Sequence, residues 1–373
     1  MSDARVALYA SVGAVLTRYG VDVAAATLEP HGSVTLPANV QYAWPHASRR
    51  FLYVASSDGG SGMGAAGSVH HVSAFRIDPD TGALAPHGAP IRLPSRPIHM
   101  ATDIASEYIL VAFSNPSAVR VYRVNADATP GEEVPQPEPV DAGIFAHQVR
   151  ATPDNRQVIL VTRGHDAAEG KPEAPGALKV FEFRGGILGR AVSVAPGGGY
   201  GFGPRHLDFH PTQPWVYVAL ERQNMLDMFA LRDGALSPAP VFRKATLAGA
   251  GAGGQRQLVG TVHVHPNGRA VYVANRSSGA AGENSLAVFA IDPASGEPRL
   301  IQHVDTRGVH PRCFHIDPGG RLLVVAHITG AMDIPARLSV FRIAEDGQLG
   351  FARAYDVDVG QRTMWWMGMI GLS

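Results

Sequence analysis

Residues 205–221, RHLDFHPTQPWVYVALE, contain the pattern that decides the fold. A charged residue opens a short apolar run, a proline turn follows, and a second run ends on another charged residue. Apolar and polar residues alternate along the runs, which is typical of half-buried β-strands, so the segment predicts a hairpin. The pattern recurs at 39–56, 98–114, 147–163, 261–276 and 312–328, although the copy at 98–114 lacks the turn proline.

Each copy is followed by a third strand-like run, such as LDMFALR at 226–232 and LAVFAID at 286–292, and by a less regular fourth run. The equivalent turn positions, from Pro45 to Pro318, lie 49–59 residues apart. Tandem units of four strands, each roughly 40–50 residues long, form the blades of a β-propeller. We therefore predict an all-β fold of four-stranded antiparallel blades, with the excess length in loops.

The six copies leave both ends of the chain unassigned. Residues 5–36 can form three further strands but no innermost one, and the tail MWWMGMI at 364–370 can supply that strand. Pairing of the C-terminal strand with the N-terminal blade would close the ring and remove its free edges. The prediction is a single seven-bladed β-propeller domain over residues 1–373.

Composition argues against several classes of function. Lys and Arg together number 32 and Asp and Glu also number 32, so the chain carries no basic footprint for nucleic acid or anionic lipid. Cys313 is the only cysteine, which excludes a disulfide framework and a multi-cysteine zinc site. The first residues lack the apolar run of a secretory signal, and no window approaches 18 uninterrupted apolar residues. We expect a cytoplasmic protein without a membrane span.

Register brings charged residues together at one end of the predicted channel. The first two strands of a blade are antiparallel, so the start of the first lies beside the end of the second. Innermost strands line the channel, and these positions from different blades should therefore converge on one cavity. Its polar members are His147, Arg163, Arg205, Glu221, Arg276 and Arg312. Four guanidiniums, one carboxylate and one imidazole predict a basic pocket for a small anion with two proton carriers. The alternative is that these groups are solvated or paired across the blade, as Arg205 with Glu221.

Four other histidines raise the question of further ligands. His310 and His327 fall close to the channel register, and we expect both to line the pocket as substrate-binding residues. His263 and His265 alternate along one strand, a spacing that can hold a metal ion. No third ligand is fixed near them by the sequence, so a structural role is favoured and no metal site is predicted.

Neighbours of the channel residues are expected to pack rather than to react. His206 follows Arg205 and should face away from it because side chains alternate along a strand. Cys313 follows Arg312 and should be a buried, inert thiol. Trp365 and Trp366 are expected to pack the closing strand.

The segment GPRHLDFHP at 203–211, followed by VYVALE at 216–221, resembles the lactonase family of seven-bladed propellers. YVANRSS at 272–278 and HPRCFHIDPGGRLLVVA at 310–326 extend the resemblance over most of the chain. The family includes bacterial propeller-type phosphogluconolactonase and fungal carboxymuconate cyclase. The resemblance implies that the active site consists of His147, Arg205, Glu221 and Arg276 and uses no metal or organic cofactor. Arg163 departs from it, because relatives usually have an acidic residue there.

Three functions are compatible with these residues. In the leading hypothesis a small anionic lactone is hydrolysed, with Glu221 or His147 as general base and Arg205 and Arg276 holding a carboxylate or phosphate. The runner-up is a cycloisomerase that closes a carboxymuconate to a lactone, and the additional Arg163 slightly favours such a polyanion. The third is a binding scaffold without catalysis. We expect a monomer or weak homodimer.

Overall fold

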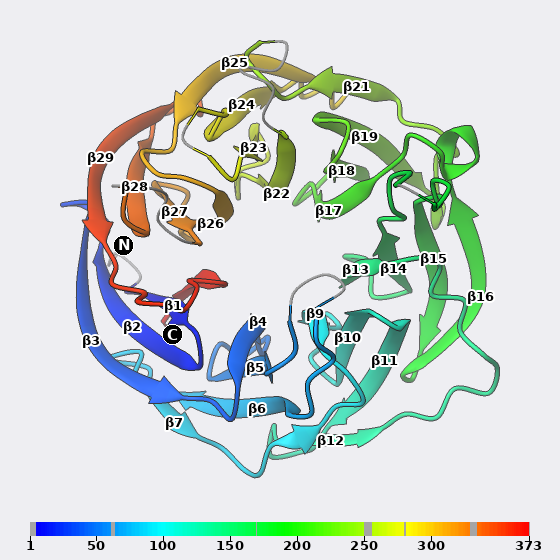
Figure 1. Ribbon diagram of the computed structural model, residues 1–373, viewed down its shortest axis with the longest axis horizontal. Coiled ribbons are helices and arrows are strands. Elements are labelled where there is room, and N and C mark those ends of the chain that lie inside the picture. Colours follow the sequence, from blue (N-terminus) through cyan, green and yellow to red (C-terminus); the bar gives the residue numbers. More distant parts are fainter. Residues whose placement is uncertain are drawn as a thin grey trace.

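The computed structural model describes residues 5–60, 64–168, 170–249, 256–279, 281–328 and 334–372. These residues form seven antiparallel sheets arranged around a central axis (Figure 1). Each sheet is one blade, and its innermost strand lies at the axis. The predicted all-β propeller with seven blades is confirmed. A single turn of 3₁₀ helix, η1 (Pro196–Gly199), interrupts the strands of the described chain.

The blades follow one another in chain order. Blade 1 contains β1 (Val6–Val12), β2 (Val15–Asp22), β3 (Thr27–Thr35) and β30 (Met367–Gly371). Blade 2 contains β4 (Asn39–Pro45), β5 (Phe51–Ser57), β6 (His70–Ile77), β7 (Leu84–Pro86) and β8 (Ile91–Arg92). Blade 3 contains β9 (Pro97–Thr102), β10 (Tyr108–Ser114), β11 (Ser117–Val124) and β12 (Pro130–Glu133). Blade 4 contains β13 (Ala146–Ala151), β14 (Gln157–Thr162), β15 (Ala177–Arg184) and β16 (Ile187–Val194).

The remaining three blades have the same arrangement. Blade 5 contains β17 (Pro204–Phe209), β18 (Trp215–Leu220), β19 (Met225–Arg232), β20 (Ala235–Leu236) and β21 (Phe242–Ala245). Blade 6 contains β22 (Leu258–Val264), β23 (Ala270–Arg276), β24 (Ser285–Ile291) and β25 (Pro298–Asp305). Blade 7 contains β26 (Pro311–Ile316), β27 (Leu322–His327), β28 (Arg337–Ile343) and β29 (Leu349–Asp356).

Blade 1 closes the ring with strands from both ends of the chain. β30 pairs antiparallel with β1, with Val6 opposite Gly371 and Ala10 opposite Met367. Both termini therefore lie at the same blade (Figure 1). The predicted closure is confirmed, and Trp366, which directly precedes β30, exchanges hydrogen bonds with the Ser11 hydroxyl at 3.0 and 3.1 Å. β30 is thus the innermost strand of blade 1, and its residues line the central channel.

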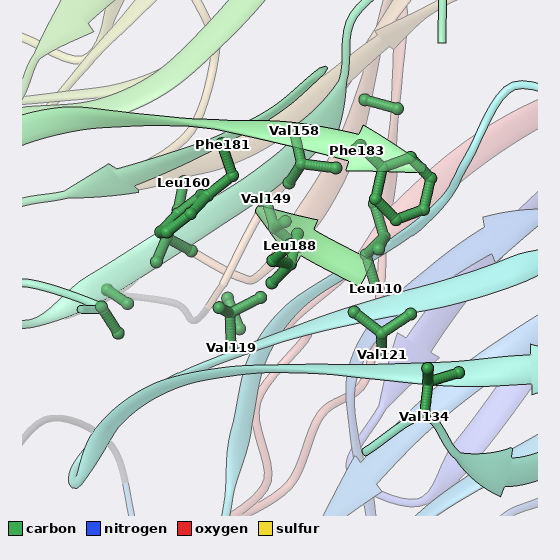
Figure 2. Close-up of a cluster of buried hydrophobic side chains, with 14 of the residues drawn as sticks. Leu110, Val119, Val121, Val134, Val149, Val158, Leu160, Phe181, Phe183 and Leu188 are labelled. Carbon is green, nitrogen blue, oxygen red and sulfur yellow. The ribbon is translucent and has the colours of Figure 1, made fainter. Parts of the chain in front are cut away.

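Hydrophobic cores lie between neighbouring blades, one at each of the seven interfaces. Figure 2 shows the core between blades 3 and 4, where Leu110 and Val121 of blade 3 meet Val158 and Phe181 of blade 4. Burying an aliphatic or aromatic side chain of this size stabilises the fold by about 1.5–3 kcal/mol. Because the hydrophobic cores join each blade to its two neighbours, a continuous ring of such contacts holds the channel walls.

A repeated tyrosine bond reinforces four of these interfaces. The hydroxyl of Tyr217 on β18 donates to the Gly296 carbonyl at 2.8 Å, in the outer hairpin of the next blade. Tyr9, Tyr53 and Tyr272 make the equivalent bond at 2.7–2.9 Å. Gly296 has a φ of 77°, and a Cβ there would lie 2.5 Å from a side-chain atom of Met228, so the turn requires glycine. Each of these bonds ties one blade to the next.

Candidate active site

The predicted strand register brings the charged residues to one end of the channel, which we call the arginine end. In blade 4, Ala146 at the start of β13 pairs with Thr162 at the end of β14. His147 and Arg163 directly follow these two residues, so they lie near each other at this end of the channel. In blade 5, Pro204 pairs with Leu220, which places Arg205 near Glu221. Arg276 ends β23 of blade 6. Neighbouring blades thus present equivalent positions to one another around the axis.

Glu221 is the centre of the arginine end. Arg163 Nη1 donates a hydrogen bond to its Oε2, and Arg276 Nη2 donates one to its Oε1. Arg205 Nε lies 3.2 Å from Oε1. The side chains of Glu221 and Arg205 are each only 2 % exposed. Burial raises the pKa of Glu221, but Arg276, Arg163 and Arg205 outweigh it and lower the pKa to about 2. The carboxylate is therefore ionised and fully engaged with cations.

His147 and Arg312 complete the group. Burial lowers the pKa of His147 well below its ordinary value, and Arg205 and Arg163 lower it further, so the imidazole is neutral. The guanidinium of Arg312, the second residue of β26, has no hydrogen bond or ion pair with any described side chain and stacks 3.5 Å from the centre of the Trp365 ring. The arginine end therefore carries four guanidiniums against one carboxylate.

His310 joins this group and His327 does not. Arg276 Nη1 donates to His310 Nε2 at 2.9 Å, and burial together with Arg276 lowers the pKa of His310 to about 3. His327 is fully buried, and its Nδ1 lies 3.0 Å from the Arg337 carbonyl. His327 ends β27, and Ile328 holds the register position of Glu221, so alternation turns the histidine to the other face. The expectation that His327 lines the pocket is corrected.

A cavity of about 250 Å³ runs along the channel from this group. His147, Arg205 and Arg312 line it near the arginine end, and Arg150, Asp208, His263 and His315 line it toward the opposite end, which we call the Asp208 end. The apolar wall comes from β4, β30 and the segment before β30, including Tyr42, Trp44 and Met367. A volume of this size suits a small molecule bound beside the guanidiniums.

His206 lines this cavity, contrary to the expectation that it packs away from Arg205. The pairing of β17 with β18 shifts register between Pro204 and His206, and the bulge directs two consecutive side chains to the channel. The His206 ring lies 5.3 Å from the His147 ring, centre to centre. A bulge between Pro311 and Cys313 likewise brings the Cys313 thiol to the cavity wall, where burial raises its pKa to about 11. The thiol is therefore protonated, but it is only partly buried, whereas the sequence predicts a buried side chain.

The two tryptophans before β30 differ from each other in their surroundings, and so do the two histidines of the His263 and His265 pair. Trp366 is buried and packs the closing strand as expected, whereas Trp365 lies over Arg312 at the cavity wall. His265 locks a turn, with Nε2 2.8 Å from the Gly320 carbonyl, and His263 instead contacts Asp208. The described residues contain no group of three His, Cys, Asp or Glu side chains arranged for a metal ion. They also contain no helix long and apolar enough to cross a membrane.

Comparison with known proteins agrees with this architecture. Residues 5–365 match the family described as "Lactonase, 7-bladed beta-propeller". The chain belongs to this lactonase family. It is 28% identical to 6-phosphogluconolactonase of Cronobacter sakazakii over 364 residues, which cover 91% of the chain and 92% of that relative. It is also 28% identical to 6-phosphogluconolactonase of Bacillus subtilis over 267 residues, covering 69% and 70%.

Solved structures of lactonase propellers share the fold of this family member. The periplasmic gluconolactonase PpgL of Pseudomonas aeruginosa superposes with a TM-score of 0.77 at 23% identity, covering 99% of this chain and all of that one. At this level of identity the likeness concerns the fold alone.

Proposed function

We propose that the protein is a lactonase that hydrolyses a small anionic lactone in the channel cavity. The observation that carries the proposal is the unbalanced charge of the arginine end, where four guanidiniums face one carboxylate and where Arg205, Arg312 and the neutral imidazole of His147 line a cavity of about 250 Å³. An anionic substrate would supply the missing negative charge. Relatives named 6-phosphogluconolactonase support a sugar-acid lactone as the substrate class.

His147 is the better candidate for the general base. A carboxylate with a pKa of about 2 that already binds three guanidiniums, as in Glu221, has little affinity for a proton. His147 is neutral and lines the cavity, and the negative charge of a bound substrate would raise its pKa toward neutrality. Glu221 would instead hold Arg163, Arg205 and Arg276 in position.

The reaction would proceed by addition of water to the lactone carbonyl. His147 takes a proton from the water as its oxygen bonds to the carbonyl carbon, and Arg205 stabilises the oxyanion that forms. The bond between the acyl carbon and the ring oxygen then breaks, and the proton from His147 passes to the departing ring oxygen. The products are a hydroxyl group and a carboxylic acid, which releases its proton to solvent.

The experiment follows ring opening by NMR for neutral sugar lactones, phosphosugar lactones and carboxymuconates, with spontaneous hydrolysis subtracted. We expect accelerated lactone opening that falls by about 10²–10⁴-fold in His147→Gln. Arg92→Gln, which alters an exposed arginine on β8, is the matched control and should retain full activity. No acceleration with any lactone would overturn the proposal, and closure of a carboxymuconate would favour the cycloisomerase.

A further inference from the structure

Two guanidiniums from distant parts of the chain lie over the Trp365 ring. Arg312 lies 3.5 Å and Arg96 lies 5.5 Å from the centre of its ring. Arg312 belongs to blade 7, Arg96 directly precedes β9 of blade 3, and Trp365 lies in the segment that leads into β30. Cation–π attraction of this kind holds guanidiniums in place without neutralising them.

The indole also stands between two hollows. Trp365 and Gln41 line the channel cavity, where Arg312 and Arg205 are found, and they line an adjoining groove of about 270 Å³. Arg96 lines that groove, together with Asn39, Gln361, Arg362 and Thr363. A ligand bound beside His147 in the channel would therefore have Trp365, Arg312 and the groove next to it.

Neither cation has an anionic partner within the described part of the chain. No hydrogen bond or ion pair joins Arg96 or Arg312 to a carboxylate there, whereas Arg163, Arg205 and Arg276 all share Glu221. Burial lowers the pKa of Arg96 to about 10 and that of Arg312 well below its ordinary value. Arg96 Nε and Trp365 Nε1 are buried donors without an acceptor. Buried cations and donors left in this state are costly unless a ligand satisfies them.

We infer that Arg96, Trp365 and Arg312 form an anion subsite that binds the charged tail of the substrate, a phosphate or a carboxylate. The subsite rests on the proposed function, because it places the tail at Trp365 while the lactone carbonyl reaches Arg205 and His147. Arg96 is then a specificity-determining residue. It distinguishes charged from neutral lactones without contacting the reacting bond.

The test compares Arg96→Gln with Arg92→Gln, which removes an exposed arginine four residues earlier on blade 2. Kinetics are measured with a sugar lactone that carries a terminal phosphate and with its neutral counterpart. We expect Arg96→Gln to raise KM for the phosphorylated lactone about ten- to hundredfold and to leave kcat and the neutral substrate unchanged. Arg92→Gln should alter neither substrate.

Direct binding separates this inference from the proposed function. Calorimetric titration with inorganic phosphate, 6-phosphogluconate and glucarate should show weaker binding in Arg96→Gln and in Trp365→Leu. Preference for 6-phosphogluconate over glucarate, which carries a carboxylate at the tail in place of the phosphate, would identify the tail as a phosphate, and the reverse would identify a carboxylate. Arg96-dependent binding without lactone hydrolysis would support the subsite and overturn the proposed function. Equal affinities in the original protein and in both variants would overturn the subsite, whatever the activity.

Discussion

The two ends of the channel both bury ions, but they balance charge differently. At the Asp208 end, Asp208 faces one guanidinium, Arg150, at 3.3 Å and one imidazole, His263, at 3.4 Å. It also accepts a backbone hydrogen bond from Val264 at 3.0 Å. Burial raises its pKa, but the contacts with His263 and Arg150 outweigh burial and lower it. This network is complete within the protein.

At the arginine end, the buried positive charges outnumber the negative charges of the described residues. Glu221 neutralises one of its guanidiniums, and Arg312 has no carboxylate partner among the described residues. A balanced network of buried ions stabilises a fold or fixes its geometry, whereas an excess of buried cations favours the binding of an anionic ligand. The comparison therefore separates a structural end of the channel from a functional one.

Removal of Glu221 should produce the largest change. Glu221→Gln leaves the neighbouring guanidiniums without a counter-charge, so we expect the free energy of unfolding to fall by about 3–5 kcal/mol. Urea denaturation measures this change. Added phosphate should recover part of the loss, because an anion can replace the missing charge. A variant as stable as the original protein would show that Glu221 does not hold the cations.

Asp208→Asn should have a smaller effect on stability. The amide keeps part of the hydrogen bonding, and only one guanidinium loses its partner, so we expect a loss of about 1–3 kcal/mol in urea denaturation. Turnover of lactone should stay within about threefold of the original value, as no reacting group is placed there. A collapse of turnover in a folded Asp208→Asn protein would assign chemistry to the structural end.

Acid should weaken both ends through histidine. Burial lowers the pKa of His310, with Arg276 adding to it, to about 3, and burial together with His263 lowers that of His315 to about 4. The unfolded chain binds these protons near pH 6.5, so unfolding takes up protons and the free energy of unfolding falls as pH drops below 6.5. Each histidine contributes about 1.4 kcal/mol per pH unit.

Denaturation curves between pH 7.5 and 5 measure this slope. His310→Gln and His315→Gln should each reduce it by one proton, and stability above pH 7 should not depend on these pKa values. An unchanged slope in either variant would show that folding does not lower the pKa of the replaced histidine.

The smallest effect is expected at Trp44, the aromatic partner of Arg150 at 4.9 Å. Trp44→Phe keeps an aromatic ring over the guanidinium, so we expect less than about 1 kcal/mol of lost stability. The equivalent change at the other end, Trp365→Phe, should instead weaken phosphate binding with little effect on stability. Weaker phosphate binding in Trp44→Phe, with unchanged phosphate binding in Trp365→Phe, would contradict the assignment of the ends.

Strand register was sufficient to predict most of the arginine end. His147, Arg205, Glu221 and Arg276 occupy positions that repeat in each hairpin, and antiparallel pairing brings such positions together whatever the loops do. His327 was misplaced because one residue of offset changes the face of a strand. Asp208 and His263 could have been found by applying the same register to the far ends of the first strands.

The repeat pattern and the missing innermost strand of blade 1 determined the blade architecture and the closure by β30, because alternation and turn chemistry are local properties of the chain. Tertiary structure alone placed His206 in the cavity, because the alternation of side chains along a strand does not predict where a bulge inserts an extra residue. It alone brought Arg96 to Trp365, more than 200 residues away in the chain. These segments lie outside the repeat, and only closure of the ring sets the distance between them.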